Sequence, residues 1–79
     1  HFETYRICVR PGGSLDEQPH MAGTEEYVTV FSGEVEISAG DERFTLATGD
    51  SLRFRADTEH SYKNPGECDA WLSMVIYYG

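Results

Sequence analysis

Long apolar segments are missing from this sequence of 79 residues. No stretch approaches the roughly 20 consecutive apolar residues with which a helix crosses a bilayer, and no basic segment followed by an apolar one marks a signal peptide. Membrane-spanning and secreted proteins are therefore both disfavoured. We expect a soluble domain in the cytoplasm.

Basic residues are also scarce. The chain has 6 Lys and Arg against 14 Asp and Glu, which gives a formal net charge of -8. This charge repels the phosphate backbone of nucleic acids, so the sequence predicts no direct contact between this segment and DNA. If the chain takes part in gene regulation, another domain must hold the DNA.

Cysteine occurs only at Cys8 and Cys68, which do not form the Cys-x-x-Cys spacing of redox and zinc motifs. Two cysteines without a secretory signal favour free thiols, with one disulfide between them as the alternative. No Ser/His/Asp or Cys/His set, phosphate-binding glycine loop or basic aromatic patch is visible. Nucleophilic catalysis is therefore not indicated.

Helical periodicity is absent too, because no window of a dozen residues keeps the spacing of an amphipathic helix. Short alternating segments separated by Gly, Pro, Asn and Asp are typical of strands instead. We expect eight strands, at residues 2–9, 14–18, 25–31, 34–38, 42–47, 51–55, 59–63 and 69–78. The turn residues at Gly33 and Gly40 predict a three-stranded meander over residues 25–47, with Val35 and Ile37 on its core face.

The last expected strand is apolar on both faces. Trp71, Val75 and Tyr77 share one face, and Ala70, Leu72, Met74 and Ile76 share the other. A strand of this kind is expected to be covered on both sides, either by two sheets of one monomer or by a second subunit packed against residues 72, 74 and 76. A chain this short buries only a little over half of its unfolded surface, which is consistent with a homodimer.

Two segments carry histidine or carboxylate side chains beside glycine-marked turns. The later segment runs from Gly49 through an expected strand to His60 and Asn64, and the spacing of these three residues resembles the second motif of the cupin superfamily. Arg55 and Asp57 stand where that motif has Pro and Gly. Asn64 is expected to fix the following turn rather than to contact a ligand.

The earlier segment resembles the first cupin motif, whose glutamate and closing glycine correspond to Glu26 and Gly33. The two histidine positions of that motif fall on Gln18 and His20, so one imidazole remains there. Over residues 2–78 the chain resembles the C-terminal cupin domain of bacterial helix-turn-helix regulators of the XRE type. Short segments that carry this resemblance are Gly-Asp-Ser-Leu-Arg-Phe-Arg-Ala-Asp and Tyr-x-Asn-Pro-Gly.

The resemblance implies an all-β fold, a small jelly-roll β-barrel of about eight strands, as one domain over residues 1–79. It also implies that the chain is the C-terminal part of a longer regulator, as its start at His1 without Met suggests. In such a regulator a small-molecule effector binds in the barrel mouth and the domain dimerises. An N-terminal domain then binds the DNA.

A candidate metal site follows from the two motifs. Glu26 has the strand parity of Val28 and Val30, and a carboxylate among apolar side chains needs a cation or a hydrogen-bond donor. With His20 and His60 it makes the set of two imidazoles and one carboxylate that binds iron, manganese, nickel or zinc.

Gln18 and Tyr62 are predicted to line the ligand site, Tyr62 because it has the parity of His60. Several alternatives stay open. The metal candidates can instead form a hydrogen-bonded polar cluster without metal, and Glu25 is an alternative to Glu26. The chain as a whole can be a metal-dependent cupin enzyme, such as a dioxygenase or isomerase, or a purely structural dimerisation module.

Overall fold

A computed structural model describes residues 1–79 as strands, turns and loops. It has no helix long and apolar enough to cross a membrane. The strands are β1 (Phe2–Val9), β2 (Ser14–Glu17), β3 (Glu25–Ser32), β4 (Glu34–Ala39), β5 (Glu42–Ala47), β6 (Ser51–Arg55), β7 (His60–Lys63) and β8 (Ala70–Tyr77). The prediction of an all-β fold with eight strands is confirmed.

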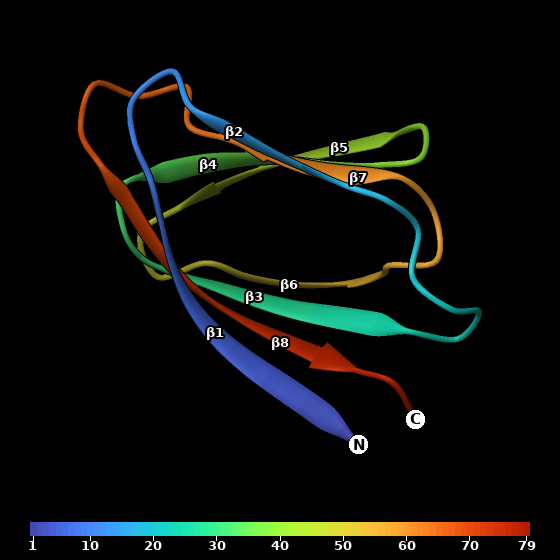
Figure 1. Cartoon of the computed structure of the whole chain (residues 1–79). Helices are drawn as coiled ribbons and strands as arrows, with labels where there is room; N and C mark the ends of the chain where they lie inside the picture. The colour runs from blue at the N-terminus through green and yellow to red at the C-terminus, as the bar shows by residue number, and fades with distance from the viewer.

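Two four-stranded sheets face each other (Figure 1). Sheet A has the strand order β1-β8-β3-β6, and sheet B has the order β2-β7-β4-β5. All neighbouring strands are antiparallel, and most are distant in sequence because the chain passes repeatedly from one sheet to the other. This is a jelly-roll arrangement, and the side chains between the sheets form the core.

The predicted meander over residues 25–47 is wrong. β4 pairs with β5 through the turn at Gly40, as expected, but β3 belongs to sheet A and pairs with β6 and β8. The chain crosses between the sheets at Gly33, where φ is 90° and glycine is favoured. A Cβ atom at Gly33 would lie 2.8 Å from the Ala70 Cα and from the Asp69 carbonyl oxygen. Gly33 therefore permits a close crossing rather than a hairpin.

The core consists of apolar side chains that alternate along the strands and point between the sheets. Its most deeply buried aliphatic members of large size are Val28, Val30, Val35, Ile37, Leu72 and Met74. The predicted core positions of Val35 and Ile37 are confirmed.

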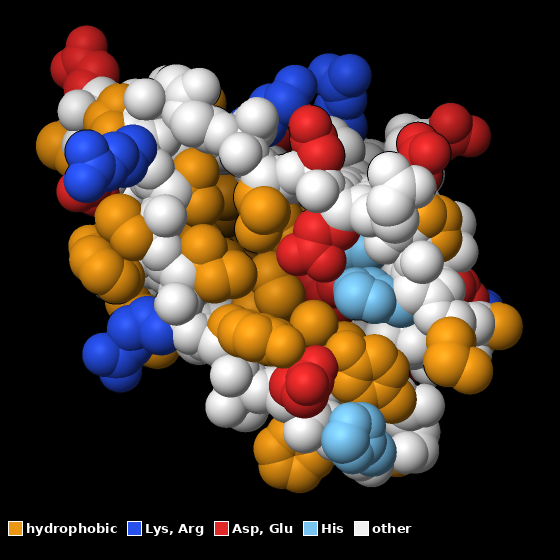
Figure 2. Space-filling model, viewed as in Figure 1, with side chains coloured by type: hydrophobic (Ala, Val, Ile, Leu, Met, Phe, Trp, Pro, Cys, Tyr) orange, Lys and Arg blue, Asp and Glu red, His pale blue; other side chains and the backbone are white.

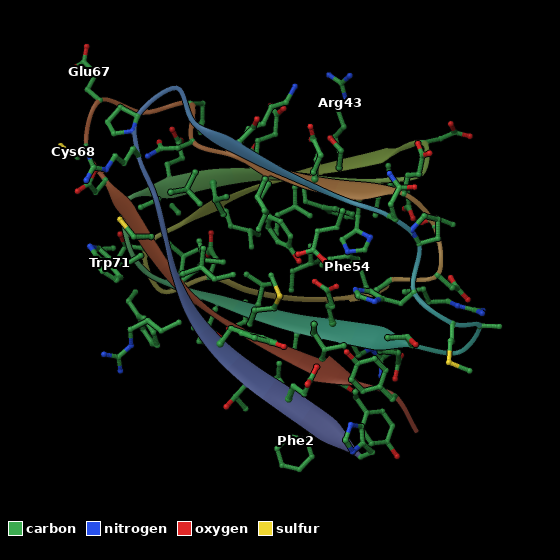
Figure 3. The ribbon with its side chains drawn as sticks, in the orientation of Figure 1. Phe2, Arg43, Phe54, Glu67, Cys68 and Trp71 are labelled. Carbon is green, nitrogen blue, oxygen red and sulfur yellow. The ribbon has the colours of Figure 1, made fainter.

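The two faces of β8 have different surroundings. Ala70, Leu72, Met74 and Ile76 are buried in the core of one chain, so they do not pack across a subunit boundary. On the opposite face Trp71 and Tyr77 are 43% and 42% exposed, and Figure 3 shows Trp71 pointing away from the molecule. The alternative in which two sheets of one monomer cover both faces of this strand is therefore wrong, as is the alternative that places residues 72, 74 and 76 against a second subunit.

Asn64 is buried and connects two loops. Its side-chain nitrogen donates to the carbonyl oxygens of Val9 (2.8 Å) and Cys68 (2.7 Å), and its side-chain oxygen accepts from the Gly66 amide (2.9 Å). The expected structural role of Asn64 is confirmed. Cys68, like Cys8, is an exposed free cysteine.

Candidate metal centre

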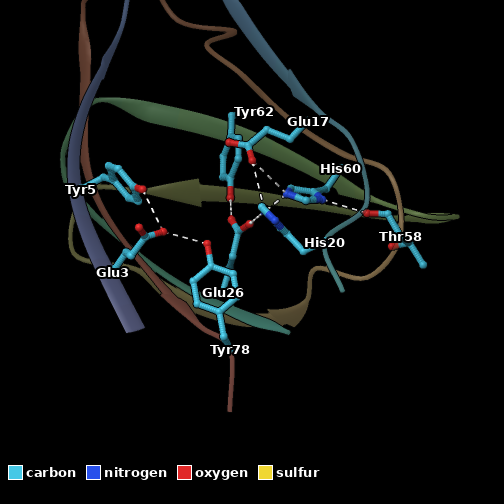
Figure 4. A network of polar contacts seen from close by, with 9 residues as sticks. All are labelled: Glu3, Tyr5, Glu17, His20, Glu26, Thr58, His60, Tyr62 and Tyr78. Atoms are coloured by element: carbon cyan, nitrogen blue, oxygen red, sulfur yellow. Dashed lines mark hydrogen bonds and ion pairs between the residues drawn. The ribbon is translucent and has the colours of Figure 1, made fainter. Parts of the chain in front are cut away.

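Four side chains meet at one end of the barrel interior (Figure 4). Glu17 ends β2, His20 lies in the following loop, Glu26 is near the start of β3, and His60 begins β7. Glu17 and His60 are cross-strand partners, and Glu26 faces them from sheet A. The amide of His20 donates to the Ala56 carbonyl (2.9 Å), which holds the loop beside the cluster.

The spacing of the donor atoms fits the ligands of a single ion. His60 Nε2 lies 2.9 Å from Glu26 Oε2 and 3.6 Å from Glu17 Oε2. His20 Nε2 lies 3.2 Å and 3.4 Å from the same two oxygens. Ligand atoms bound to one ion at about 2.0–2.2 Å are separated by roughly 3.0–3.6 Å. The four side chains therefore surround a position that a metal ion fits.

The buried atoms of this cluster lack hydrogen bonds. Glu26 is 0% and His60 3% exposed, yet Glu26 Oε2, His60 Nε2 and His20 Nε2 have no hydrogen-bond partner. The short Glu26–His60 separation does not have the direction of a hydrogen bond, so proximity alone does not satisfy these atoms. Buried polar atoms are nearly always paired, and three unpaired ones around a common point fit a cation.

The backbone orients the His60 ring. Its Nδ1 lies 2.8 Å from the Thr58 carbonyl oxygen, which only accepts, so Nδ1 carries the hydrogen. In the neutral ring Nε2 then presents its lone pair to the cluster, as in metal-ligating histidines. Burial works to lower the pKa of His60, but Glu26, the Thr58 carbonyl and Glu17 outweigh it, and the net pKa is raised. Positive charge at Nε2, from a proton or a metal ion, is therefore favourable.

Tyr62 supports Glu26 from the other side. Its hydroxyl donates to Glu26 Oε1. Burial and the negative charge of Glu26 raise the pKa of the Tyr62 hydroxyl, so the group stays protonated and acts as a donor. This hydrogen bond leaves Glu26 Oε2 directed toward the histidines.

The structure brings most of the predicted site residues together. His20, Glu26, His60 and Tyr62 lie in one cluster. Gln18 lies apart from it, because its side chain is exposed and makes none of the contacts of the cluster. Glu25, the alternative to Glu26, pairs instead with Arg53 at 3.7 Å on the outer face.

Glu17 is the site residue that the sequence analysis missed. A signal for it exists, because Glu17 has the strand parity of Leu15, an apolar residue that packs against the core, whereas Gln18 has the opposite parity. The motif alignment placed a site residue at Gln18, one residue later than Glu17. Glu17 thus adds a second carboxylate to the two imidazoles.

The cluster is reached from the side of the barrel between β1 and β2, the edge strands of the two sheets. Figure 2 shows a hollow on this side that is lined by hydrophobic side chains, with acidic and histidine side chains around it. The side chains of His20 and Glu17 are 23% and 22% exposed, whereas those of Glu26 and His60 are 0% exposed. A ligand entering here meets the first pair before the second.

A separate cavity of about 860 Å³ lies between β5 and β6. Its lining includes the apolar side chains of Phe44, Leu52 and Phe54. The ring of Phe54 also packs edge-on against His60, with 5.7 Å between centroids. Phe54 therefore lies between this cavity and the metal candidates.

Comparison with known proteins identifies the family. The cupin domain family matches residues 5–77. The HTH-type transcriptional regulator SutR of Escherichia coli (strain K12) is 34% identical over 77 residues, which are 98% of this chain and 43% of that regulator. The xanthan biosynthesis protein XanB of Xanthomonas campestris is 36% identical over 74 residues, 94% of this chain and 16% of that protein. The chain thus spans less than half the length of either relative.

Solved structures support the same family. The crystal structure of the cupin domain of an XRE family transcriptional regulator from Enterobacter cloacae has a TM-score of 0.93 and 33% identity, over 99% of this chain and 82% of that one. An HTH_3 family transcriptional regulator from Vibrio cholerae has a TM-score of 0.92 at 24% identity, which supports the fold alone. Because the family match covers nearly the whole length and the two sheets have the jelly-roll order, this chain belongs to the cupin family.

Proposed function

We propose that this cupin domain is the effector-sensing part of a DNA-binding transcriptional regulator, with a divalent metal ion held at the barrel mouth. The observation that carries the metal site is the buried pair of Glu26 Oε2 and His60 Nε2, which approach to 2.9 Å without a hydrogen bond. A buried carboxylate without a cation or a donor is costly. A metal ion bound by this pair, with Glu17 and His20, removes that cost.

The donor set suits iron, manganese, nickel or zinc. Imidazole and carboxylate ligands are shared by these ions, and the two carboxylates of Glu17 and Glu26 balance a divalent charge. A bound ion would supply a Lewis-acid site for an oxygen atom of the effector. Tyr62 would orient Glu26, and the Thr58 carbonyl would orient His60.

The regulatory role rests on the relatives, which include cupin domains of XRE-type regulators. In this proposal residues 1–79 form one cytoplasmic domain at the C-terminus of a longer polypeptide, and another domain contacts DNA, in keeping with the net charge of -8. The effector changes DNA binding only if it binds one arrangement of the regulator more tightly than another.

Metal titration is the direct test. After removal of metal with a chelator, the chain should bind one divalent ion with a calorimetric signal, and its thermal unfolding midpoint should rise as ligand binding requires. Elemental analysis of protein purified without chelator should identify the ion. Absence of binding by all four candidate ions would refute the metal site.

The regulatory part needs a second measurement, on the whole regulator polypeptide. Its affinity for operator DNA should change on addition of metal and effector, by the coupling that allostery demands. An unchanged DNA affinity together with turnover of an organic substrate by the metal-loaded domain would favour the enzyme alternative instead.

We also propose that the domain forms a homodimer through the outer face of sheet A. The large apolar side chains on this face are Phe2, Tyr27, Phe31, Trp71 and Tyr77, all at least 40% exposed. Large exposed apolar side chains gathered on one face are typical of an interface. The outward-facing strand positions hold one acid, Glu25, and three bases, Arg6, Arg53 and Arg55, so most of the acidic charge of the chain lies on other faces.

The size of this face corresponds to a weak interface. Three strands of eight residues and one of five present roughly 460 Å² per copy. Two such faces total roughly 900 Å², below the roughly 1,200 Å² of standard specific interfaces and in the range of weak ones. Other faces of the molecule carry more acidic side chains, which disfavours them as self-contacts.

Sedimentation equilibrium tests the dimer. The chain should sediment as a dimer, and Trp71→Ser should shift it toward monomer. Met21→Ser is the matched control, because Met21 is also exposed (81%) but lies in the loop between β2 and β3. A monomeric chain, or equal effects of the two substitutions, would contradict this interface.

A further inference from the structure

A third carboxylate, outside the metal candidates, faces the barrel mouth. Glu3 on β1 is the cross-strand partner of Ile76 on β8, and Ile76 is the partner of Glu26 on β3. Glu3 and Glu26 therefore occupy one row on the inner face of sheet A, with their backbones about 10 Å apart, which is twice the spacing of neighbouring strands. Unlike Glu26, Glu3 is exposed.

Two tyrosines hold Glu3 in place (Figure 4). The hydroxyls of Tyr5 and Tyr78 donate to the same oxygen of Glu3, Oε1, at 3.0 Å and 2.8 Å. The hydrogen bond to Glu3 raises the pKa of Tyr5 and raises the pKa of Tyr78 to about 12, so both phenols stay protonated and act as donors. The second oxygen of Glu3 has no hydrogen-bond donor from the protein.

The tyrosine cluster and the metal candidates share one opening. The ring of Tyr78 packs edge-on against His20, with 6.2 Å between centroids. Behind His20 lie Glu26 and His60, whose facing oxygen and nitrogen atoms are buried and have no hydrogen-bond partner. A ligand in the mouth therefore meets both groups of side chains.

No basic side chain balances Glu3, because it takes part in none of the ion pairs of the molecule. A fixed carboxylate with a free oxygen is the chemistry that accepts a charge-assisted hydrogen bond from an ammonium group. We propose that Glu3, Tyr5 and Tyr78 form a second subsite of the mouth, which binds the ammonium group of a small molecule.

The ammonium subsite at Glu3 and the metal candidates together narrow the chemical class of the effector. This step rests on the proposed metal-dependent sensing function. With its ammonium group at Glu3 and an oxygen anion at the metal candidates, the effector is an amino carboxylate or a similar zwitterion. The backbones of Glu3 and Glu26 lie about 10 Å apart across the sheet, so the two charged groups of such a molecule belong to different ends of an extended chain.

The ammonium subsite is tested first on the metal-free chain, by NMR titration with n-butylammonium and with 1-butanol as its uncharged counterpart. Signals of Tyr5 and Tyr78 should shift with the ammonium, which should bind about tenfold more tightly than the alcohol, as a charged hydrogen bond implies. Glu3→Gln should abolish this preference. Glu67→Gln, an exposed glutamate far from the mouth (Figure 3), should leave it unchanged.

A competing location is the acidic pair at the metal candidates. If Glu17→Gln removes butylammonium binding and Glu3→Gln does not, the subsite is refuted. Equal binding of ammonium and alcohol refutes it as well.

The second stage compares 5-aminopentanoate with pentanoate on the zinc-loaded chain. The amino compound should bind about tenfold more tightly, and Glu3→Gln should remove that difference. Equal binding of the two compounds would overturn the assignment of the effector class. Failure of zinc to bind at all would count against the proposed metal-dependent function, whereas the butylammonium result decides the ammonium subsite independently.

Discussion

The two ends of the barrel interior are built by the same strands from different side chains. On β3, Val28 and Val30 enter the apolar end, and Glu26, two residues before Val28, enters the polar end. On β8, Leu72 lies at the apolar end, whereas Ile76 borders Glu26. Strand alternation thus delivers both sets of side chains to one interior, and only their chemistry differs.

The apolar end of the interior stabilises the fold, whereas the polar end is suited to binding a metal ion. Buried apolar side chains stabilise the fold by roughly 1.5–3 kcal/mol each when fully removed from water. The polar end instead buries a carboxylate and an imidazole whose facing atoms lack hydrogen bonds, an arrangement that costs stability until a cation satisfies it. Substitutions at the two ends should therefore have opposite consequences.

The largest effect is expected at the apolar end, for Leu72→Ala. Leu72 is fully buried, and truncation there should lower the free energy of unfolding by about 2–5 kcal/mol through lost burial and a cavity. Urea denaturation of the metal-free chain measures this loss. Zinc affinity of the fraction that remains folded should stay unchanged, and a parallel loss of affinity would show that the two ends are not independent.

At the polar end, Glu26→Gln should weaken metal binding without lowering the stability of the metal-free chain. The amide keeps an acceptor for the Tyr62 hydroxyl and adds a donor for the bare Nε2 of neutral His60, so stability of the metal-free chain should be unchanged or raised at a pH where His60 is neutral. Metal affinity should fall by at least about 100-fold, since even outer partners of metal ligands contribute 10- to 100-fold.

Calorimetric titration and urea denaturation of the same Glu26→Gln sample check both parts. A stability loss comparable to that of Leu72→Ala would mean that Glu26 is a structural residue. Retained metal affinity would exclude it as a ligand.

Alternation and turn residues were sufficient to predict the strands, because half-buried strands record their environment in every second residue. They did not predict how the strands pair. Gly33 looks like a hairpin residue in sequence, but its conformation serves a crossing between sheets, and the close contact with Ala70 that requires glycine comes from a strand almost forty residues later. Such long-range pairing leaves no local signal.

The candidate site shows the same limit. His20, Glu26 and His60 were predicted from motif spacing, and Tyr62 from parity. Their convergence depends on how the two sheets face each other and on the register between β2 and β7, neither of which the sequence encodes locally. That register places Glu17 opposite His60, and a count of residues within one motif pointed to its neighbour instead.

The choice between these neighbours is itself testable. Glu17→Gln should weaken metal binding by about tenfold or more, because it removes an anionic ligand with its oxygen 3.4 Å and 3.6 Å from the two imidazoles. Gln18→Ala should leave affinity unchanged, because Gln18 is exposed. Calorimetric titration of both variants measures the two losses of metal affinity. A larger loss for Gln18→Ala than for Glu17→Gln would favour Gln18, the residue expected from the motif.

The smallest expected effect is the pH dependence of stability, which should arise at the polar end of the interior and not at the apolar end. The raised pKa of His60 means that the folded metal-free chain binds a proton more tightly than the unfolded chain, whose imidazole titrates near 6.5. This contribution to stability is fully present below about pH 6.5 and is lost as pH rises through the raised pKa of the folded state. Glu26→Gln should reduce the effect, because Glu26 is a main source of the raised pKa.

Metal reverses this dependence, because an ion at His60 Nε2 displaces the proton. Zinc affinity should therefore increase as pH rises over the same interval. Urea denaturation at pH 6 and pH 8, with and without zinc, measures both slopes. Leu72→Ala should shift all four free energies of unfolding downward by a similar amount and leave the slopes intact, since no titrating group is altered. Slopes of equal sign with and without zinc would mean that proton and metal do not share the His60 nitrogen.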